Sequence, residues 1–162
     1  DLKDLSLCGH SMGGLIALDM VFQRKFSAKS LILVNSIYPT RVADALLTKA
    51  KTGNGHAADF IIKYGLYRRL LGLKNAFSDG DEPVMLNDLH ACNNYQLDLS
   101  ELKNLRIPIS IILGSKDRLV DLKAVENFTN AVSCYTHTMD EVGHFSFFED
   151  PENLSKLISE IA

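Results

Sequence analysis

Gly9-His10-Ser11-Met12-Gly13-Gly14 follows directly on the apolar run Leu5-Ser6-Leu7-Cys8, and it contains the pattern Gly-x-Ser-x-Gly. This pattern is typical of a nucleophile elbow, a strained turn between a strand and a helix that holds a serine side chain clear of its backbone. Gly9 and Gly13 stand two residues either side of Ser11, where such a turn leaves no room for bulky side chains. The stretch therefore predicts a strand, an elbow and a helix, with Ser11 as a catalytic nucleophile.

The residues after the elbow predict a buried helix. Positions 15–22 are apolar on nearly every side, and Arg24 and Lys25 follow them, as in a crossover helix that packs on a sheet. The first turn of this helix would aim free backbone N–H groups at the reacting centre. The N–H of Met12 is therefore the candidate donor to a developing oxyanion.

Two later loops offer an acid and a base. A buried strand is predicted over 106–114, and Asp117 lies in the loop beyond its final glycine. A second strand over 134–139 leads into a loop that contains His144. Because sites in open α/β sheets assemble outside the carboxyl ends of the strands, both loops can converge on Ser11.

Other residues compete for these two roles. Asp121 is the alternative acid, but it fits better as the N-cap of a helix that begins at Leu122. The chain has five histidines. His10 lies inside the elbow, and the three that remain besides His144 lie in segments with no strand-end loop: His56, His90 and His137. We therefore favour Asp117 as the acid and His144 as the base.

Together these segments resemble the carboxyl-terminal part of a cap-bearing α/β-hydrolase, from the superfamily of lipases, esterases and proline-iminopeptidase-like enzymes. The chain order Ser, Asp, His is that of this superfamily. The segments similar to its motifs are 9–14 (elbow), 114–117 (acid loop), Gly143-His144 with Glu149, Pro151 and Glu152 (histidine loop and last helix), and 88–93 (return of the cap to the core). The resemblance implies an α/β fold with a parallel sheet, flanking helices and an inserted helical cap, and it implies no metal and no cofactor.

The resemblance also implies a partial fold. The chain reaches the elbow strand within a few residues, whereas the family has about half of its sheet before that point, including a His-Gly type loop with the second oxyanion donor. We therefore expect a fragment in which the amino-terminal half of the sheet is missing. Alone, such a fragment is expected to be inactive and poorly soluble, because the elbow strand would have a bare apolar edge.

The chain of 162 residues divides into three expected blocks. These are 1–38, the first part of the hydrolase core, which ends after a strand over 30–35; 39–100, a helical cap; and 101–162, the second part of the core. In the cap, helices are predicted over 41–51 and 57–71, with breaks at 53–55 and 78–83. The last core helix is predicted over 151–161, with Asp150 as N-cap and Pro151 at the first helical position.

The cap is expected to shape the substrate pocket, because it overhangs the carboxyl ends of the strands. Its expected apolar face is Phe60, Ile61, Tyr64, Leu66, Tyr67, Leu70 and Leu71. Lys63, Arg68 and Arg69 are either a carboxylate-binding patch or the solvated side of a helix. The candidate substrate contacts are His10, Tyr38, Leu119, Val120 and Phe145.

Composition restricts the partners. The net charge of −3 without a long basic run argues against nucleic acid and anionic membrane surfaces, and no apolar run has membrane-spanning length. Three cysteines, Cys8, Cys92 and Cys134, are interpreted as reduced core residues, which favours a cytoplasmic location. The sequence does not predict the oligomeric state.

The expected reaction is acyl transfer to water. His144, oriented by Asp117, takes the proton from Ser11, which attacks a small ester- or lactone-like carbonyl and forms an acyl-enzyme. Carbon–carbon bond hydrolysis, peptide hydrolysis, cyanide addition or removal, a hormone-receptor-like role and an inactive fragment stay open, because the triad alone does not separate them. A halide-displacing enzyme is disfavoured, since it needs an aspartate in place of Ser11.

Overall fold

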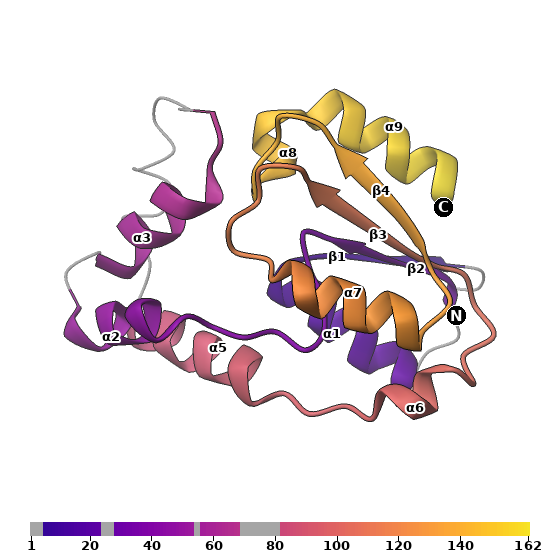
Figure 1. The fold of residues 1–162 in the computed structure, drawn as a ribbon, viewed down its shortest axis with the longest axis horizontal. Helices are drawn as coiled ribbons and strands as arrows, with labels where there is room; N and C mark the ends of the chain where they lie inside the picture. Colours follow the sequence, from indigo (N-terminus) through magenta and orange to yellow (C-terminus); the bar gives the residue numbers. More distant parts are fainter. Residues whose placement is uncertain (1–4, 24–27, 54–55, 69–81) are drawn as a thin grey trace.

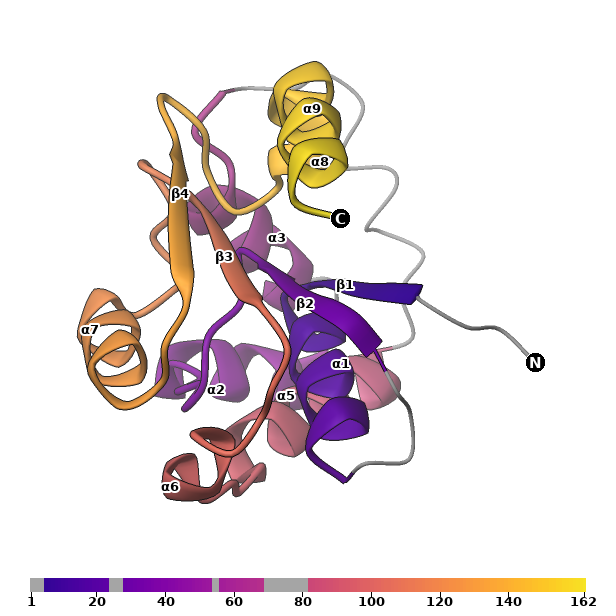
Figure 2. The same cartoon turned by 90° about the vertical axis from the view of Figure 1, so that its right-hand side faces the viewer.

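A four-stranded parallel sheet forms the centre of the computed structural model, which describes residues 5–23, 28–53, 56–68 and 82–162 (Figures 1 and 2). Its strands lie in chain order: β1 (Leu5–His10), β2 (Ala28–Val34), β3 (Ile109–Gly114) and β4 (Tyr135–Met139). This confirms the predicted α/β class with a parallel sheet. The third strand begins later than its predicted start at 106, since Pro108 has no N–H to donate to a neighbouring strand.

Helices cover both faces of the sheet. Side chains alternate along a strand, so Leu31 and Leu33 of β2 pack on one face with α1 (Met12–Phe22) and α7 (Leu122–Ala131). Ile32 and Val34 point to the other face, where α9 (Pro151–Ile161) packs through Leu154. Apolar side chains on both faces explain why β2 is a continuous hydrophobic run.

Two expectations of burial are wrong. Ile16 and Met20 of α1 are 52% and 39% exposed, because this helix lies in the outer layer and only its other side faces the sheet. Cys8 is exposed, since β1 pairs with β2 alone among the described strands. Cys92 and Cys134 are partly buried against the core, and all three thiols are free.

Three of the described helices between β2 and β3 form a separate layer beside the sheet (Figure 1). They are α2 (Asp44–Thr52), α3 (His56–Gly65) and α5 (Glu82–Asn94), and they enclose a small core of Val42, Leu46, Ala50 and Ala57. Gly53 ends α2 with a φ of 74°, as the predicted break requires. The helix predicted over 57–71 is wrong in length: α3 ends at Gly65, and residues 69–71 lie outside the described part.

The remaining helices are short or lie near the carboxyl terminus. They are α6 (Leu99–Leu102) and α8 (Ser146–Glu149), together with α7 and α9. Asp121 caps α7 by accepting from the Lys123 N–H at 2.9 Å, and Asp150 caps α9 with Pro151 in its first turn, as predicted. Among the described residues, no helix is long and apolar enough to cross a membrane.

Candidate active site

Ser11 lies in a strained turn between β1 and α1. Its φ of 51° and ψ of −122° fall in a region that residues with a side chain rarely adopt. Its N–H donates to Val34 O at 3.0 Å, and its carbonyl accepts from Gly14 N at 2.9 Å. Neighbouring backbone therefore fixes the turn, and the elbow geometry predicted from the sequence is present.

The glycines of the elbow differ from the prediction in one respect. A Cβ at Gly9 would collide with the Gly13 carbonyl, so the first glycine is required as expected. A Cβ at Gly13 would meet no described atom within 4 Å, whereas one at Gly14 would collide with the Ser36 side chain. The second residue that must be small is therefore Gly14, because α1 packs there against the chain that leaves β2.

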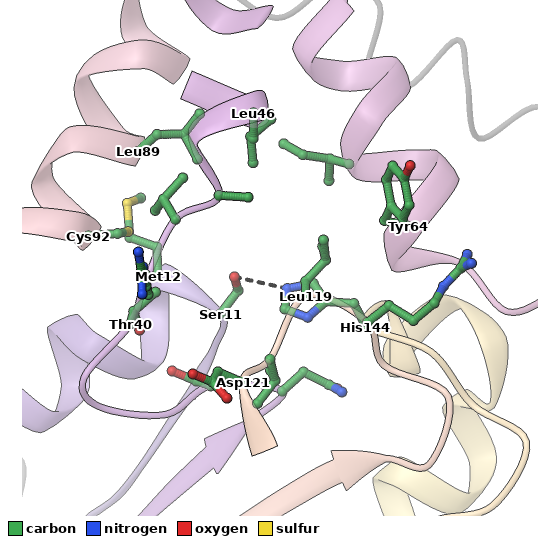
Figure 3. A pocket seen from close by; sticks show the side chains of 18 of the residues that line it. Ser11, Met12, Thr40, Leu46, Tyr64, Leu89, Cys92, Leu119, Asp121 and His144 are labelled. Carbon is green, nitrogen blue, oxygen red and sulfur yellow. Dashed lines mark hydrogen bonds between the residues drawn. The ribbon is translucent and has the colours of Figure 1, made fainter. Parts of the chain in front are cut away.

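The structure brings the three predicted catalytic residues together. His144 Nε2 lies 3.0 Å from Ser11 Oγ, and His144 Nδ1 lies 2.8 Å from Asp117 Oδ2 (Figure 3). The side chains of His144 and Asp117 are only 7% and 3% exposed. This geometry allows His144 to accept a proton from Ser11 while Asp117 holds the ring, and the catalytic roles themselves stay predictions.

Asp117 sits in a turn after β3 that surrounds its carboxylate with donors. The N–H groups of Leu119 and Val120 donate to Oδ1 at 2.8 and 3.2 Å, as in an Asx turn. Burial opposes ionisation of this carboxyl, but the hydrogen bond and attraction of His144, together with the Leu119 N–H and Asn35, keep the pKa of Asp117 below its ordinary value. Asp117 is therefore held as a carboxylate, whereas Asp121 uses its side chain as a helix cap.

Asn35 is a site residue that the sequence analysis missed. It follows β2 directly, is 1% exposed, and has a φ of 46°. Its Nδ2 donates to Asp117 Oδ2 at 3.0 Å and to Gly143 O at 3.2 Å, and its Oδ1 accepts from Ser146 Oγ at 2.7 Å. A polar residue at the carboxyl end of a buried strand was the available signal, because that edge of the sheet also carries the other site residues.

Glu149 is a second missed residue, and it joins the histidine loop to the end of α3. Its buried carboxylate accepts from Gly143 N at 3.0 Å, from Tyr67 N at 3.0 Å and from Arg68 N at 2.9 Å. In the sequence, Glu149 stands out only as part of the motif of the histidine loop and last helix. Its function as an acceptor depends on chain segments more than 80 positions apart, which no local pattern reveals.

A pocket of about 660 Å³ opens over Ser11 and His144. Figure 3 shows Leu46 and Leu89 on one side, Tyr64 on another and Asp121 opposite them, around the Ser11–His144 hydrogen bond. The apolar lining comes mainly from the helical layer and from the acid loop: Val42, Leu46, Phe60, Ile61, Leu89, Leu119 and Val120. Ile37, in the chain that leaves β2, adds to it. Among the described residues, no group of His, Cys, Asp or Glu side chains could hold a metal ion.

Most of the predicted substrate contacts line this pocket. These are His10, Leu119, Val120 and Phe145. Met12, the candidate oxyanion donor, also lines the pocket, and as the first residue of α1 it has an N–H without a helical acceptor. Tyr38 departs from the prediction, because it is not among the described residues that line the pocket. Its ring is 6% exposed, and its hydroxyl donates to Leu97 O and accepts from Leu97 N.

Only some residues of the expected apolar cap face line the pocket. Phe60, Ile61 and Tyr64 line the pocket, whereas Leu66 and Tyr67 do not, because α3 ends before them. Leu70, Leu71 and Arg69 lie outside the described residues. Lys63 is exposed on α3, as expected of the solvated side of a helix, and Arg68 is exposed beyond the end of α3, where it forms a 4.0 Å ion pair with Glu141.

Comparisons with known proteins identify the family of this fold. Residues 1–157 match the model of a family described as alpha/beta hydrolase. The pimeloyl-[acyl-carrier protein] methyl ester esterase of Aromatoleum aromaticum is 26% identical over an alignment of 184 positions. The alignment covers 98% of this chain and 74% of that protein. This chain is thus similar to an esterase along nearly its whole length.

Solved structures with the same fold include two hydrolases. The esterase from Exiguobacterium antarcticum superposes with a TM-score of 0.85 at 20% identity. The matched region covers 99% of this chain and 67% of the esterase chain. The enol-lactonase from Burkholderia xenovorans superposes with a TM-score of 0.77 at 18% identity. The matched region covers 95% of this chain and 64% of the lactonase chain. The chain therefore spans about two thirds of the length of these structures.

Proposed function

Because the chain belongs to the alpha/beta hydrolase family, we propose that it is a serine hydrolase that cleaves small ester- or lactone-like substrates through an acyl-enzyme. The observation that carries the proposal is the pair of hydrogen bonds that His144 makes, at 3.0 Å to Ser11 Oγ and at 2.8 Å to Asp117 Oδ2. The esterase and lactonase names of the similar proteins support the same reaction class.

The proposed reaction begins when Ser11 Oγ attacks the carbonyl carbon and His144 Nε2 takes the hydroxyl proton. The carbonyl oxygen becomes an oxyanion, to which the Met12 N–H donates. His144 then gives its proton to the leaving alkoxide, and an acyl ester remains on Ser11. A water molecule attacks this ester with His144 again as base, which releases the acid and restores Ser11.

Asp117 has a supporting part in this reaction. Its Oδ2 accepts from Nδ1 of His144, so the ring presents an unprotonated Nε2 to Ser11. The lowered pKa of Asp117 keeps the carboxylate charged while the imidazolium forms. Orientation of the ring and stabilisation of its positive charge are the two contributions of this residue.

The pocket favours an ester with an apolar part. We propose that the layer of α2, α3 and α5 acts as a cap, since Leu46, Phe60 and Leu89 face the space above Ser11. Apolar walls bind an acyl chain or an alcohol of moderate size by removing its surface from water. The methyl ester esterase among the relatives suggests a small alcohol as the leaving group.

Because we expect this chain to be part of a longer hydrolase, the intact protein is used with p-nitrophenyl esters to test this proposal. An early burst of p-nitrophenol, equal to the enzyme concentration, is expected if acylation precedes slower deacylation. Ser11→Ala is expected to abolish the burst and to lower kcat by several orders of magnitude. An intact protein with the correct fold and no hydrolysis of any ester would overturn the proposal and favour a non-catalytic role.

A matched pair of variants tests which aspartate is the acid. Asp117→Asn is expected to lower kcat about a thousandfold or more, because the ring loses its carboxylate partner. Asp121→Asn is expected to change stability by about 1 kcal/mol or less and to leave kcat nearly unchanged, since asparagine also caps helices. The reverse pattern would assign the acid role to Asp121.

A further inference from the structure

Both backbone polar groups of His144 are held by other segments. Its N–H donates to Gly65 O, at the end of α3, over 2.6 Å. Its carbonyl oxygen lies 2.7 Å from Nε2 of His10, the residue before the proposed nucleophile. The main chain of His144 is therefore fixed from two sides, once by the helical layer and once by the elbow.

The contact with His10 has a definite direction. A carbonyl oxygen only accepts hydrogen bonds, so Nε2 of His10 must carry a proton and donate it. Burial lowers the pKa of His10 to about 4, against the hydrogen bond to His144 O, which raises it. His10 is thus a neutral ring at working pH, with one N–H committed to the main chain of His144.

Aromatic packing keeps the His10 ring in place. Its centroid lies 4.9 Å from that of His144 in an edge-on arrangement, and 4.8 Å from that of Phe147, also edge-on. Phe145 lies on a third side, at 6.0 Å between centroids. Through this packing and the hydrogen bond of its Nε2, His10 contacts the histidine loop at His144, Phe145 and Phe147 and can support it.

We propose that His10 is a positioning residue, which sets the place of the His144 main chain relative to Ser11 through its Nε2–H hydrogen bond to the His144 carbonyl. His10 and Ser11 share a peptide bond, so this contact ties the backbone of the base to the backbone of the nucleophile. The inference rests on the proposed function of Ser11 and His144. A displacement of about 1 Å between reacting groups can lower a rate about a hundredfold, which makes such a tie significant for kcat.

Two variants separate the hydrogen bond from the packing. His10→Leu fills a similar space without a donor, and His10→Gln offers a carboxamide N–H at a similar reach. With p-nitrophenyl acetate, His10→Leu is expected to lower kcat about tenfold to a hundredfold with little change in KM, and His10→Gln is expected to restore most of the loss. Phe148→Leu is the matched control, because it removes a half-exposed aromatic ring of the same short helix, α8, that packs on Phe147, and its kcat is expected to stay within about twofold.

A proton NMR measurement on the same variants does not depend on catalytic activity. The proton on Nδ1 of His144, bonded to Asp117, is expected to give a low-field proton NMR signal that broadens or vanishes in His10→Leu and persists in His10→Gln. An active wild type with unchanged kcat and an unchanged NMR signal in His10→Leu would overturn the inference. So would a His10→Gln variant as impaired as His10→Leu at an equal melting temperature. An inactive wild type would instead refute the proposed function, and the NMR signal would still decide the positioning role.

Discussion

Asn35 Nδ2 donates to Asp117 Oδ2 over 3.0 Å, and so connects the end of β2 to the loop after β3. The same amide group donates to Gly143 O, the residue before His144. One buried side chain therefore supports both the proposed acid and the loop of the proposed base. Its positive φ of 46° is a conformation that asparagine tolerates better than most residues, and it turns the chain toward the site.

Asn35→Asp is expected to impair turnover. The substitution keeps the shape of the side chain but replaces the donor on Asp117 by a second carboxylate, which opposes the charge that the mechanism needs. Since hydrogen bonds to charged groups are worth about 1.5–3 kcal/mol, kcat is expected to fall about tenfold to a hundredfold. Ser146→Ala is the control, because it removes the hydrogen bond to Asn35 Oδ1 and leaves the donor on Asp117. Equal kcat values in both variants would argue against the role of the amide.

Glu149→Gln is expected to lower the stability of the protein. The carboxylate accepts from three backbone N–H groups, and a glutamine would turn an amide donor toward at least one of them. Leaving a buried N–H unsatisfied costs about 1–3 kcal/mol in the free energy of unfolding, which urea denaturation measures. Glu152→Gln, at an exposed position of α9, serves as the matched control with an expected change within about 0.5 kcal/mol. An unfolding free energy of Glu149→Gln close to that of the control would contradict this account.

The two glycines after Ser11 are expected to respond differently to alanine. Gly13→Ala places a methyl group in open space within α1 and is expected to be neutral or to stabilise by up to about 1 kcal/mol. Gly14→Ala drives a methyl group into the Ser36 side chain and is expected to destabilise by about 1–3 kcal/mol. Melting temperatures of the two variants check this order. A less stable Gly13→Ala would restore the original interpretation of the motif.

The stability of the protein is expected to decrease as the pH is lowered, because of His10. Its pKa drops from 6.5 to about 4 on folding, mainly through burial; the hydrogen bond to His144 O and the charge of Asp117 raise this pKa, and repulsion from the His144 ring lowers it. Between these two values the unfolded chain binds more protons than the folded one, so this contribution is complete above about pH 6.5 and is lost as the pH falls toward 4. Its upper value is on the order of 3 kcal/mol. Denaturation of wild type and His10→Gln at several pH values measures the difference, and parallel curves would contradict it.

The sequence allowed the parallel sheet and the three site loops to be predicted because both depend on local patterns. The apolar run before Ser11 and the polar loops after β3 and β4 each lie within a few residues of the feature that they predict. Helix caps at Asp121 and Asp150 were predictable for the same reason.

The supporting contacts were not predictable, because they depend on tertiary packing. The side chain of Glu149 meets Tyr67 only once α3 lies against the histidine loop, and Gly14 must be small only because Ser36 packs beside it. Exposure of Cys8 likewise depends on which strands flank β1. Amphipathic patterns report that a residue is apolar or polar, but they do not report which segment covers it.

Covalent labelling of Ser11 tests the central claim most directly. A fluorophosphonate reacts with a serine whose hydroxyl is activated by a neighbouring histidine, and mass spectrometry of the digested protein locates the adduct. In the intact protein we predict one adduct per molecule on the peptide that contains Ser11, a strongly reduced rate in His144→Ala, and no adduct in Ser11→Ala. An adduct on another residue, or undiminished labelling of Ser11→Ala, would contradict the assignment of Ser11 as the nucleophile.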